Sequence, residues 1–153
     1  MSPEKAKVYM GMAYKIKELS PDEETKVGAI MLSPDGRIIA SSYNGFLRGA
    51  EDDELPKTRP DKYKFMQHAE RNMLYNCCYE GIKTRDTTIF CTLSPCEECV
   101  RACFQSGVRY IYFSKLYKKF DSIDFYANME DVTINIEKVG SYVRLDMLPV
   151  KGK

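Results

Sequence analysis

Apolar residues recur along the first part of the chain at spacings that predict a helix followed by a β-hairpin. Over residues 4–19 they return every three or four positions, as on one face of an amphipathic helix, and Ser20-Pro21-Asp22 ends that pattern. Residues 27–32 and 37–43 form two short apolar runs. The turn sequence Ser33-Pro34-Asp35-Gly36 lies between them, so the two runs are expected to pair as a hairpin.

Helical and strand patterns alternate through the rest of the chain. Phe65, Ala69, Met73 and Cys77 are four residues apart, which predicts one buried stripe on a helix over residues 63–79. The other elements predicted are strands over residues 87–92, 108–113, 132–136 and 139–148, and helices over residues 95–106, with Pro95 in the first turn, and 122–129. Strands that alternate with helices need crossover connections, so we expect an α/β fold with helices on both faces of a sheet.

Size and charge limit the kind of protein that this chain can be. Its 153 residues suit a single domain, expected over residues 1–153. The net charge of +1 argues against a protein that grips long nucleic acids through their phosphates, so no stable nucleic-acid complex is expected. No apolar run approaches the roughly 18–20 residues of a membrane span, and no signal peptide is recognisable. A cytoplasmic protein with no membrane partner is therefore expected.

Cysteine and histidine supply the candidate metal ligands. In a reducing compartment the six cysteines are better interpreted as thiols or ligands than as disulfides. Cys96 and Cys99 share one face of a predicted first helical turn, where the helix dipole favours thiolates. With His68, the only histidine, they make a set of three ligands that suits zinc. Structural zinc sites usually close with four protein ligands, so three ligands indicate a catalytic site with a position left for water.

Glu70 is the candidate general acid and base beside that metal. Its carboxylate could accept a proton from water and pass it to a ring nitrogen or a departing amine. On a regular helix, positions 68 and 70 point in different directions. Both side chains can therefore reach one site only if the metal lies at the beginning of the helix, which is a geometric prediction.

Four stretches, in this order, resemble the cytidine and deoxycytidylate deaminase superfamily, and its deoxycytidylate deaminases most closely. They are residues 25–30 (TKVGAI), 43–49 (YNGFLRG), 68–72 (HAERN) and 92–99 (TLSPCEEC). The H-x-E…P-C-x-x-C pattern is a known signature of zinc deaminases. The resemblance covers residues 3–138 and implies a three-layer α/β/α cytidine-deaminase-like fold around a mixed five-stranded sheet. The small size suggests a phage or other viral member, which would act in the host cytoplasm.

The resemblance also implies a reaction and the residues that carry it out. One catalytic Zn²⁺ per chain would be bound by His68, Cys96 and Cys99, with Glu70 as the catalytic proton carrier. The chain would hydrolyse dCMP to dUMP and ammonia and so supply dUMP for thymidylate synthesis. The substrate-binding residues that the resemblance implies are Thr25, Asn44, Ala69, Ser94 and Tyr117.

Regulation is implied by the same resemblance. Members of this branch are commonly hexamers that dCTP activates and dTTP inhibits, with Mg²⁺ accompanying the effector. A homohexamer is therefore expected, and the allosteric nucleotide-binding residues would be Gly45, Phe46, Arg48, Gly49 and Asp52. Leu47 stands where the family often has proline, so the loop is expected to be less rigid and the regulation altered. No second histidine is present for the additional zinc site of some phage relatives.

Other interpretations of the same residues stay open. The chain could deaminate another cytosine nucleotide, or a base in tRNA or another polynucleotide, although its balanced charge gives little support for the latter. It could also be a non-catalytic, zinc-stabilised nucleotide-binding module, against which the presence of Glu70 argues. The remaining cysteines are interpreted as small buried apolar residues: Cys77, Cys78, Cys91 and Cys103.

Overall fold

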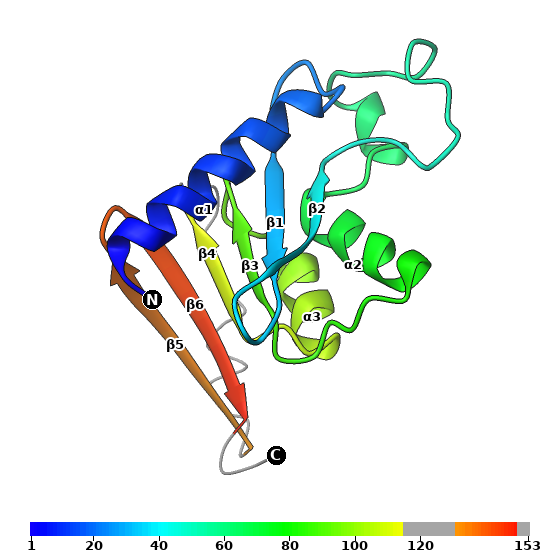
Figure 1. Cartoon of the computed structure of the whole chain (residues 1–153). Coiled ribbons are helices and arrows are strands. Elements are labelled where there is room, and N and C mark those ends of the chain that lie inside the picture. The colour runs from blue at the N-terminus through cyan, green and yellow to red at the C-terminus, as the bar shows by residue number, and fades with distance from the viewer. Residues whose placement is uncertain (115–130, 150–153) are drawn as a thin grey trace.

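A six-stranded mixed sheet forms the centre of the protein in a computed structural model that describes residues 1–114 and 131–149 (Figure 1). The strand order is β2-β1-β3-β4-β6-β5. The strands are β1 (Gly28–Leu32), β2 (Ile38–Tyr43), β3 (Thr88–Cys91), β4 (Tyr110–Phe113), β5 (Val132–Val139) and β6 (Tyr142–Pro149). The helices are α1 (Pro3–Ile16), α2 (Ala69–Glu80) and α3 (Glu97–Gln105), with short 3₁₀ turns η1 (Lys17–Leu19) and η2 (Asp61–Lys64).

The expected α/β sheet with helices on both faces is confirmed, but the sheet has six strands and not five. The sixth strand is β6, in the C-terminal region where the pattern had indicated a further strand. It pairs antiparallel with both β4 and β5, so it is an inner strand of the sheet. Among the described strands only the neighbours β3 and β4 pair in parallel, and α3 makes the crossover between them. The helix predicted over residues 122–129 lies outside the described residues.

Three layers result from strands whose side chains alternate between two buried faces. In β1 every residue is buried: Ile30 and Leu32 pack with α1, whereas Ala29 and Met31 pack with α2 and α3. A strand covered on both faces needs no polar positions, which explains why its sequence reads as one continuous apolar run. Helix α1 therefore covers one face of the sheet, and α2 and α3 cover the other (Figure 1). Among the described helices, none is long and apolar enough to cross a membrane.

The second predicted helix begins later than its apolar pattern indicates. Residues 61–64 form η2, and α2 starts only at Ala69. Between them Gln67 forms an isolated antiparallel bridge with Gly45 through two backbone hydrogen bonds of 2.7 and 3.1 Å, which keeps the chain extended. Phe65 is 40% exposed and does not join the buried stripe of this helix.

The third helix also differs from the expectation at its start. Cys96 is the N-cap residue and α3 begins at Glu97, so Pro95 precedes the helix and does not lie in its first turn. The N-cap backbone is extended, with φ −73° and ψ 167°. Cys96 is therefore outside the regular helix, at the end where the helix dipole favours a thiolate.

A buried ion pair joins the segment before β1 to the long loop after β2. The Lys62 ammonium lies 2.8 Å from the Asp22 carboxylate, and these residues are only 3% and 2% exposed. Asp22 also accepts hydrogen bonds from the Asn44 amide and from the backbone N–H groups of Glu24 and Thr25. Burial alone would raise the pKa of Asp22, but the hydrogen bond from Lys62 and the two backbone N–H groups outweigh it, so the pKa lies below its usual 3.8.

Asp22→Asn is expected to lower the free energy of unfolding at pH 7 by about 1–3 kcal/mol, because the buried Lys62 ammonium then keeps only its longer contact of 3.4 Å with the Glu24 carboxylate. Because folding lowers the Asp22 pKa, its contribution is complete above the unfolded value of 3.8 and is lost as the pH falls through the folded-state value. Urea unfolding at pH 7 and at about pH 3 measures this difference, which should shrink at the lower pH. Glu18→Gln, which removes the exposed Lys15–Glu18 pair, is the control and should cost less than about 1 kcal/mol.

Candidate active site

Two helix N-termini meet on one side of the sheet and bring the three candidate ligands together. His68 is the N-cap residue of α2, Cys96 is the N-cap residue of α3, and Cys99 lies in the first turn of α3. The Nδ1 atom of His68 is 3.4 Å from the Cys96 sulfur and 3.5 Å from the Cys99 sulfur. One ligand atom from each of the three residues lies within 4.8 Å of the other two. The prediction that the site lies at the beginning of the second helix is therefore confirmed.

These distances fit a tetrahedral zinc ion. With Zn–S near 2.3 Å and Zn–N near 2.0–2.1 Å, tetrahedral angles place nitrogen and sulfur ligands about 3.6 Å apart. The two nitrogen–sulfur distances therefore leave a position for zinc without any rearrangement of the backbone. Hydrogen bonds from the Cys99 thiol and from His68 lower the pKa of Cys96, which favours the thiolate form that binds a metal. The same contact with Cys96 raises the pKa of His68.

Glu70 follows the candidate ligand His68 by two residues. It occupies the first turn of α2 and is 3% exposed. Its Oε1 atom accepts a hydrogen bond of 2.9 Å from the thiol of Cys91, the last residue of β3. A buried carboxylate next to a metal ligand and inside a pocket is placed to transfer protons to or from a bound molecule.

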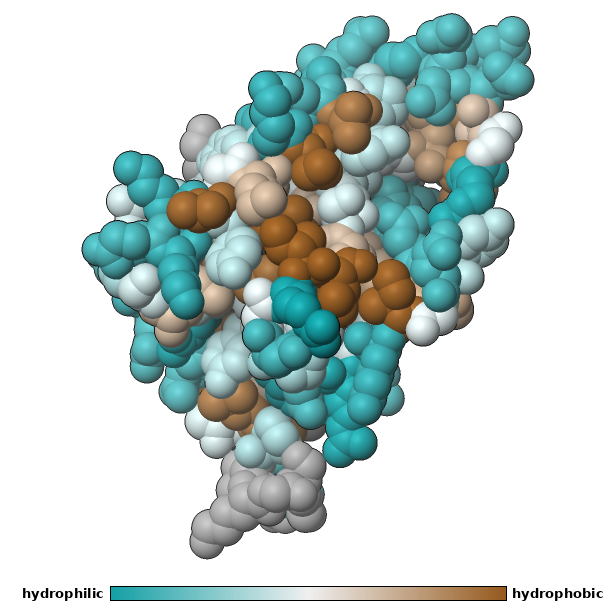
Figure 2. All heavy atoms as spheres, in the orientation of Figure 1, coloured by the Kyte–Doolittle hydropathy of each residue, from teal (hydrophilic) through white to brown (hydrophobic). Residues whose placement is uncertain are grey.

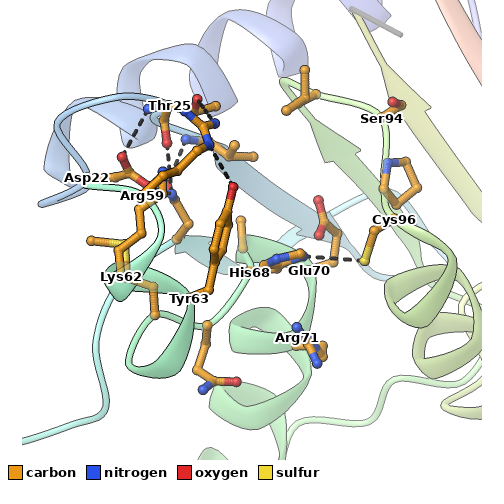
Figure 3. A pocket seen from close by; sticks show the side chains of 17 residues that line it. Asp22, Thr25, Arg59, Lys62, Tyr63, His68, Glu70, Arg71, Ser94 and Cys96 are labelled. Carbon is orange, nitrogen blue, oxygen red and sulfur yellow. Dashed lines mark hydrogen bonds and ion pairs between the residues drawn. The ribbon is translucent and has the colours of Figure 1, made fainter. Parts of the chain in front are cut away.

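The pocket beside these residues has a volume of about 290 Å³ and two chemically different ends. His68, Glu70 and Cys96 form one end, and Thr25, Arg59 and Tyr63 gather at the other (Figure 3). At the second end the Arg59 guanidinium donates to the Tyr63 hydroxyl over 2.6 Å and to the Thr25 hydroxyl over 3.1 Å. A flat, polar molecule with an anionic group could therefore lie along the pocket with its ends in two distinct environments.

Four of the five predicted substrate-binding residues line this pocket: Thr25, Asn44, Ala69 and Ser94. The side-chain amide of Asn44 is also a structural link, because its oxygen accepts from the Val27 N–H and its nitrogen donates to the Thr25 carbonyl. Their roles toward a substrate stay predictions. The fifth residue, Tyr117, lies outside the described residues.

The five predicted effector-binding residues are on the loop that follows β2, and none of them is among the residues that line the described pocket. They are Gly45, Phe46, Arg48, Gly49 and Asp52. Arg48 turns toward the outer side of α2, where its guanidinium lies 4.0 Å from the centre of the Tyr79 ring and donates to Asn76. Their binding of an effector stays a prediction.

Several residues of the site have no counterpart in the sequence predictions. Arg59, Lys62 and Tyr63 line the pocket from the end of the long loop and from η2. In the sequence, only the combination of cations and an aromatic residue there could have indicated a binding site, and that combination is equally typical of a solvated loop. Cys91 is buried as expected but also bonds to Glu70, whereas Cys78 is exposed and the interpretation of it as a buried residue is wrong.

Comparison with known proteins places these features in context. Residues 3–115 match the family model of the cytidine and deoxycytidylate deaminase zinc-binding region. The deoxycytidylate deaminase of Pongo abelii is 31% identical over 111 residues, which are 69% of this chain and 61% of that protein. The chain thus spans less than two thirds of the length of this curated relative.

Solved structures give a fuller match. The apo dCMP deaminase of cyanophage S-TIM5 is 30% identical with a TM-score of 0.68, over 82% of this chain and 94% of that chain. The same cyanophage enzyme in complex with dCMP and dUMP is 32% identical with a TM-score of 0.67, over 81% of this chain and 90% of that chain. The comparison therefore extends over nearly the whole of a protein of similar size.

Proposed function

Because the chain belongs to the cytidine and deoxycytidylate deaminase family, we propose that it hydrolyses dCMP to dUMP and ammonia. The observation that carries this proposal is the cluster of His68, Cys96 and Cys99, of which His68 and Cys96 line the same end of one pocket as the buried carboxylate of Glu70. The cyanophage relative, solved with dCMP and dUMP, supports the choice of substrate. The structural similarity to the cyanophage enzyme supports a phage-type member.

In the proposed mechanism His68, Cys96 and Cys99 hold one Zn²⁺. When bound, zinc makes water acidic enough to act as a nucleophile near neutral pH. Glu70 takes the proton that the attacking water loses and delivers it to the ring nitrogen N3, and it then carries the proton of the new C4 hydroxyl to the departing amine. The C4–N4 bond of the pyrimidine breaks as the new C4–O bond is kept, so water and dCMP give dUMP and ammonia.

The backbone at the two helix starts is proposed to position the base. The Ala69 N–H is in the first turn of α2, where backbone donors have no partner within the helix. Its carbonyl accepts a hydrogen bond of 2.6 Å from the Ser42 hydroxyl, which fixes this turn against β2. Ser94 lies opposite, just before the second ligand segment, so the pyrimidine would be held between two backbone segments that also position the ligands.

We propose that the phosphate lies toward Arg59. The Lys62 ammonium is buried in its ion pair with Asp22. The Arg59 side chain, by contrast, is 38% exposed and lines the pocket, so it can reach a ligand. Guanidinium groups bind phosphate oxygens in pairs, and in doing so Arg59 would exchange its ion pair with Glu24 for the phosphate.

Arg59→Gln is therefore expected to raise KM for dCMP about tenfold while kcat changes little, because it removes a contact to a part of the substrate that does not react. The KM for deoxycytidine, which has no phosphate, should stay unchanged. Lys64→Gln is the control: it removes the same charge from the neighbouring 3₁₀ turn at a residue that does not line the pocket. Equal KM values for dCMP in the wild type and Arg59→Gln would rule out this position for the phosphate.

An ammonia-release assay tests the proposed reaction directly. The purified protein is incubated separately with dCMP, CMP, dCTP, deoxycytidine and a tRNA anticodon stem, and bound metal is measured on the same sample. The highest kcat/KM is expected for dCMP. Preference for the tRNA stem, or no turnover of any cytosine compound by the zinc-loaded protein, would overturn the proposal.

Regulation and assembly form a second part of the proposal. The loop that carries Gly45, Phe46, Arg48, Gly49 and Asp52 would bind dCTP as an activator and dTTP as an inhibitor, each with Mg²⁺. Arg48 supports this because its guanidinium is exposed. Addition of each nucleotide with Mg²⁺ to the dCMP assay is the test, and saturation curves that respond to neither would remove the effector site.

A homohexamer of cytoplasmic chains, each a single deaminase domain, completes the proposal. Apolar side chains form a band across the face seen in Figure 2, bordered by hydrophilic ones. Exposed apolar residues of α1 and β2 include Val8, Met12 and Ile38, and β2 is an edge strand of the sheet. Such a surface supports self-association. The free thiols of the six cysteines support a reducing compartment.

A further inference from the structure

Cys91 contacts the proposed proton carrier and is not one of the three clustered candidate ligands. It is the last residue of β3, it is 0% exposed, and it pairs with Ala29 of β1 and Phe113 of β4. Its side chain faces the layer of α2 and α3, as part of the same core as Ala69. From there its sulfur lies 2.9 Å from Oε1 of Glu70.

The chemistry of the two groups fixes the direction of this hydrogen bond. Burial, followed by the charge of Glu70, raises the pKa of the Cys91 thiol well above its usual range. Cys91 therefore keeps its proton at neutral pH and donates it to the carboxylate oxygen. The donor comes from an inner strand of the sheet, which is more rigid than a loop.

We propose that Cys91 is a positioning residue, whose thiol holds one oxygen of the Glu70 carboxylate so that the other oxygen faces the reacting groups. This inference rests on the proposed deaminase function. A glutamate side chain has three rotatable bonds, and a donor on one oxygen restricts the orientation of the carboxylate. Valine would fit the same strand position by size and shape but offers no donor.

The test compares Cys91→Val with Cys91→Ser. Cys91→Val is expected to lower kcat for dCMP roughly 10- to 100-fold with KM nearly unchanged, because a misplaced proton carrier slows the chemical step without weakening binding. Cys91→Ser keeps a donor and should restore kcat to within about threefold of wild type. Cys77→Val is the matched control, since Cys77 is equally buried in the same core, where its thiol faces the sulfur of Met31.

Wild-type kcat in Cys91→Val, or equal losses of kcat in the valine and serine variants, would overturn the inference. A second measurement needs no change at Cys91. Raman spectra of wild type and Glu70→Ala are compared in the S–H stretching region. In Glu70→Ala one thiol band should lie at higher frequency than in wild type, because its hydrogen-bond acceptor has been removed. A flat difference spectrum would also overturn the inference. This band does not depend on turnover, so its result is separate from success or failure of the deaminase assay.

Discussion

Glu70→Gln is expected to lower kcat for dCMP about 1,000-fold while the protein still folds and binds zinc. Glutamine has the shape of glutamate but cannot take up a proton, so water activation and departure of the amine both lose their proton carrier. The carboxylate is not one of the three clustered ligands, and metal content should therefore be unaffected. Ammonia release, zinc per chain and the thermal midpoint, measured on one preparation, test all parts of this expectation.

Glu97→Gln is the matched control for that variant. Glu97 is also in the first turn of a helix at this site, but it is exposed and does not line the pocket. Its replacement should change kcat less than about twofold, since it removes only a helix-dipole contact. If Glu70→Gln kept wild-type turnover, the assignment of Glu70 as the proton carrier would be wrong.

Cys99→Ala is expected to abolish zinc binding and, as a result, to lower kcat for dCMP by at least about 1,000-fold. Two ligands, His68 and Cys96, remain, and two ligands hold zinc far more weakly than three. The thermal midpoint should also fall, because the metal joins the starts of α2 and α3. Metal analysis and thermal unfolding with and without added Zn²⁺ measure both effects, and added zinc should stabilise wild type only.

Cys103→Ala serves as the control for the ligand variant. Cys103 lies one helical turn after Cys99, is equally buried and faces the core. Its loss should cost some stability through the cavity it leaves, but it should leave zinc content at the wild-type value. Full zinc content in Cys99→Ala would contradict the proposed ligand set.

Local patterns were sufficient for elements whose contacts are close in the sequence. The hairpin of β1 and β2 was predictable because the turn residues and both apolar runs lie within 17 residues, 27–43. The start of α2 was not, because a long-range bridge between Gly45 and Gln67 keeps the preceding residues extended. The place of the sixth strand in the sheet was not predictable for a similar reason. Strand β6 pairs with β4, and the sequence of β6 does not indicate which strand it joins.

The same distinction applies to the site. The clustering of the three candidate ligands was predictable because it depends on short spacings within two motifs. The pocket contribution of Lys62 depends on its pairing with Asp22, 40 residues earlier in the chain. Likewise, the contact of Cys91 with Glu70 joins a strand to a helix, and a cysteine in an apolar strand looks like any small core residue until both elements are packed.

Helix α2 begins at the candidate ligand His68 and ends at Gly81, which has a φ of 71°. Helix α3 begins at the candidate ligand Cys96, and Gly107, with a φ of 94°, follows its C-cap residue Ser106. In the proposed zinc site each helix would therefore be fixed to the metal at its N-terminus and not at its C-terminus. Insertions or deletions near the distal termini can change helix length without altering the coordination geometry, whereas a single-residue insertion between Cys96 and Cys99 would rotate one sulfur by about 100° around the axis. Among related sequences, insertions and deletions should therefore occur near the C-termini of these two helices and be absent from their N-termini.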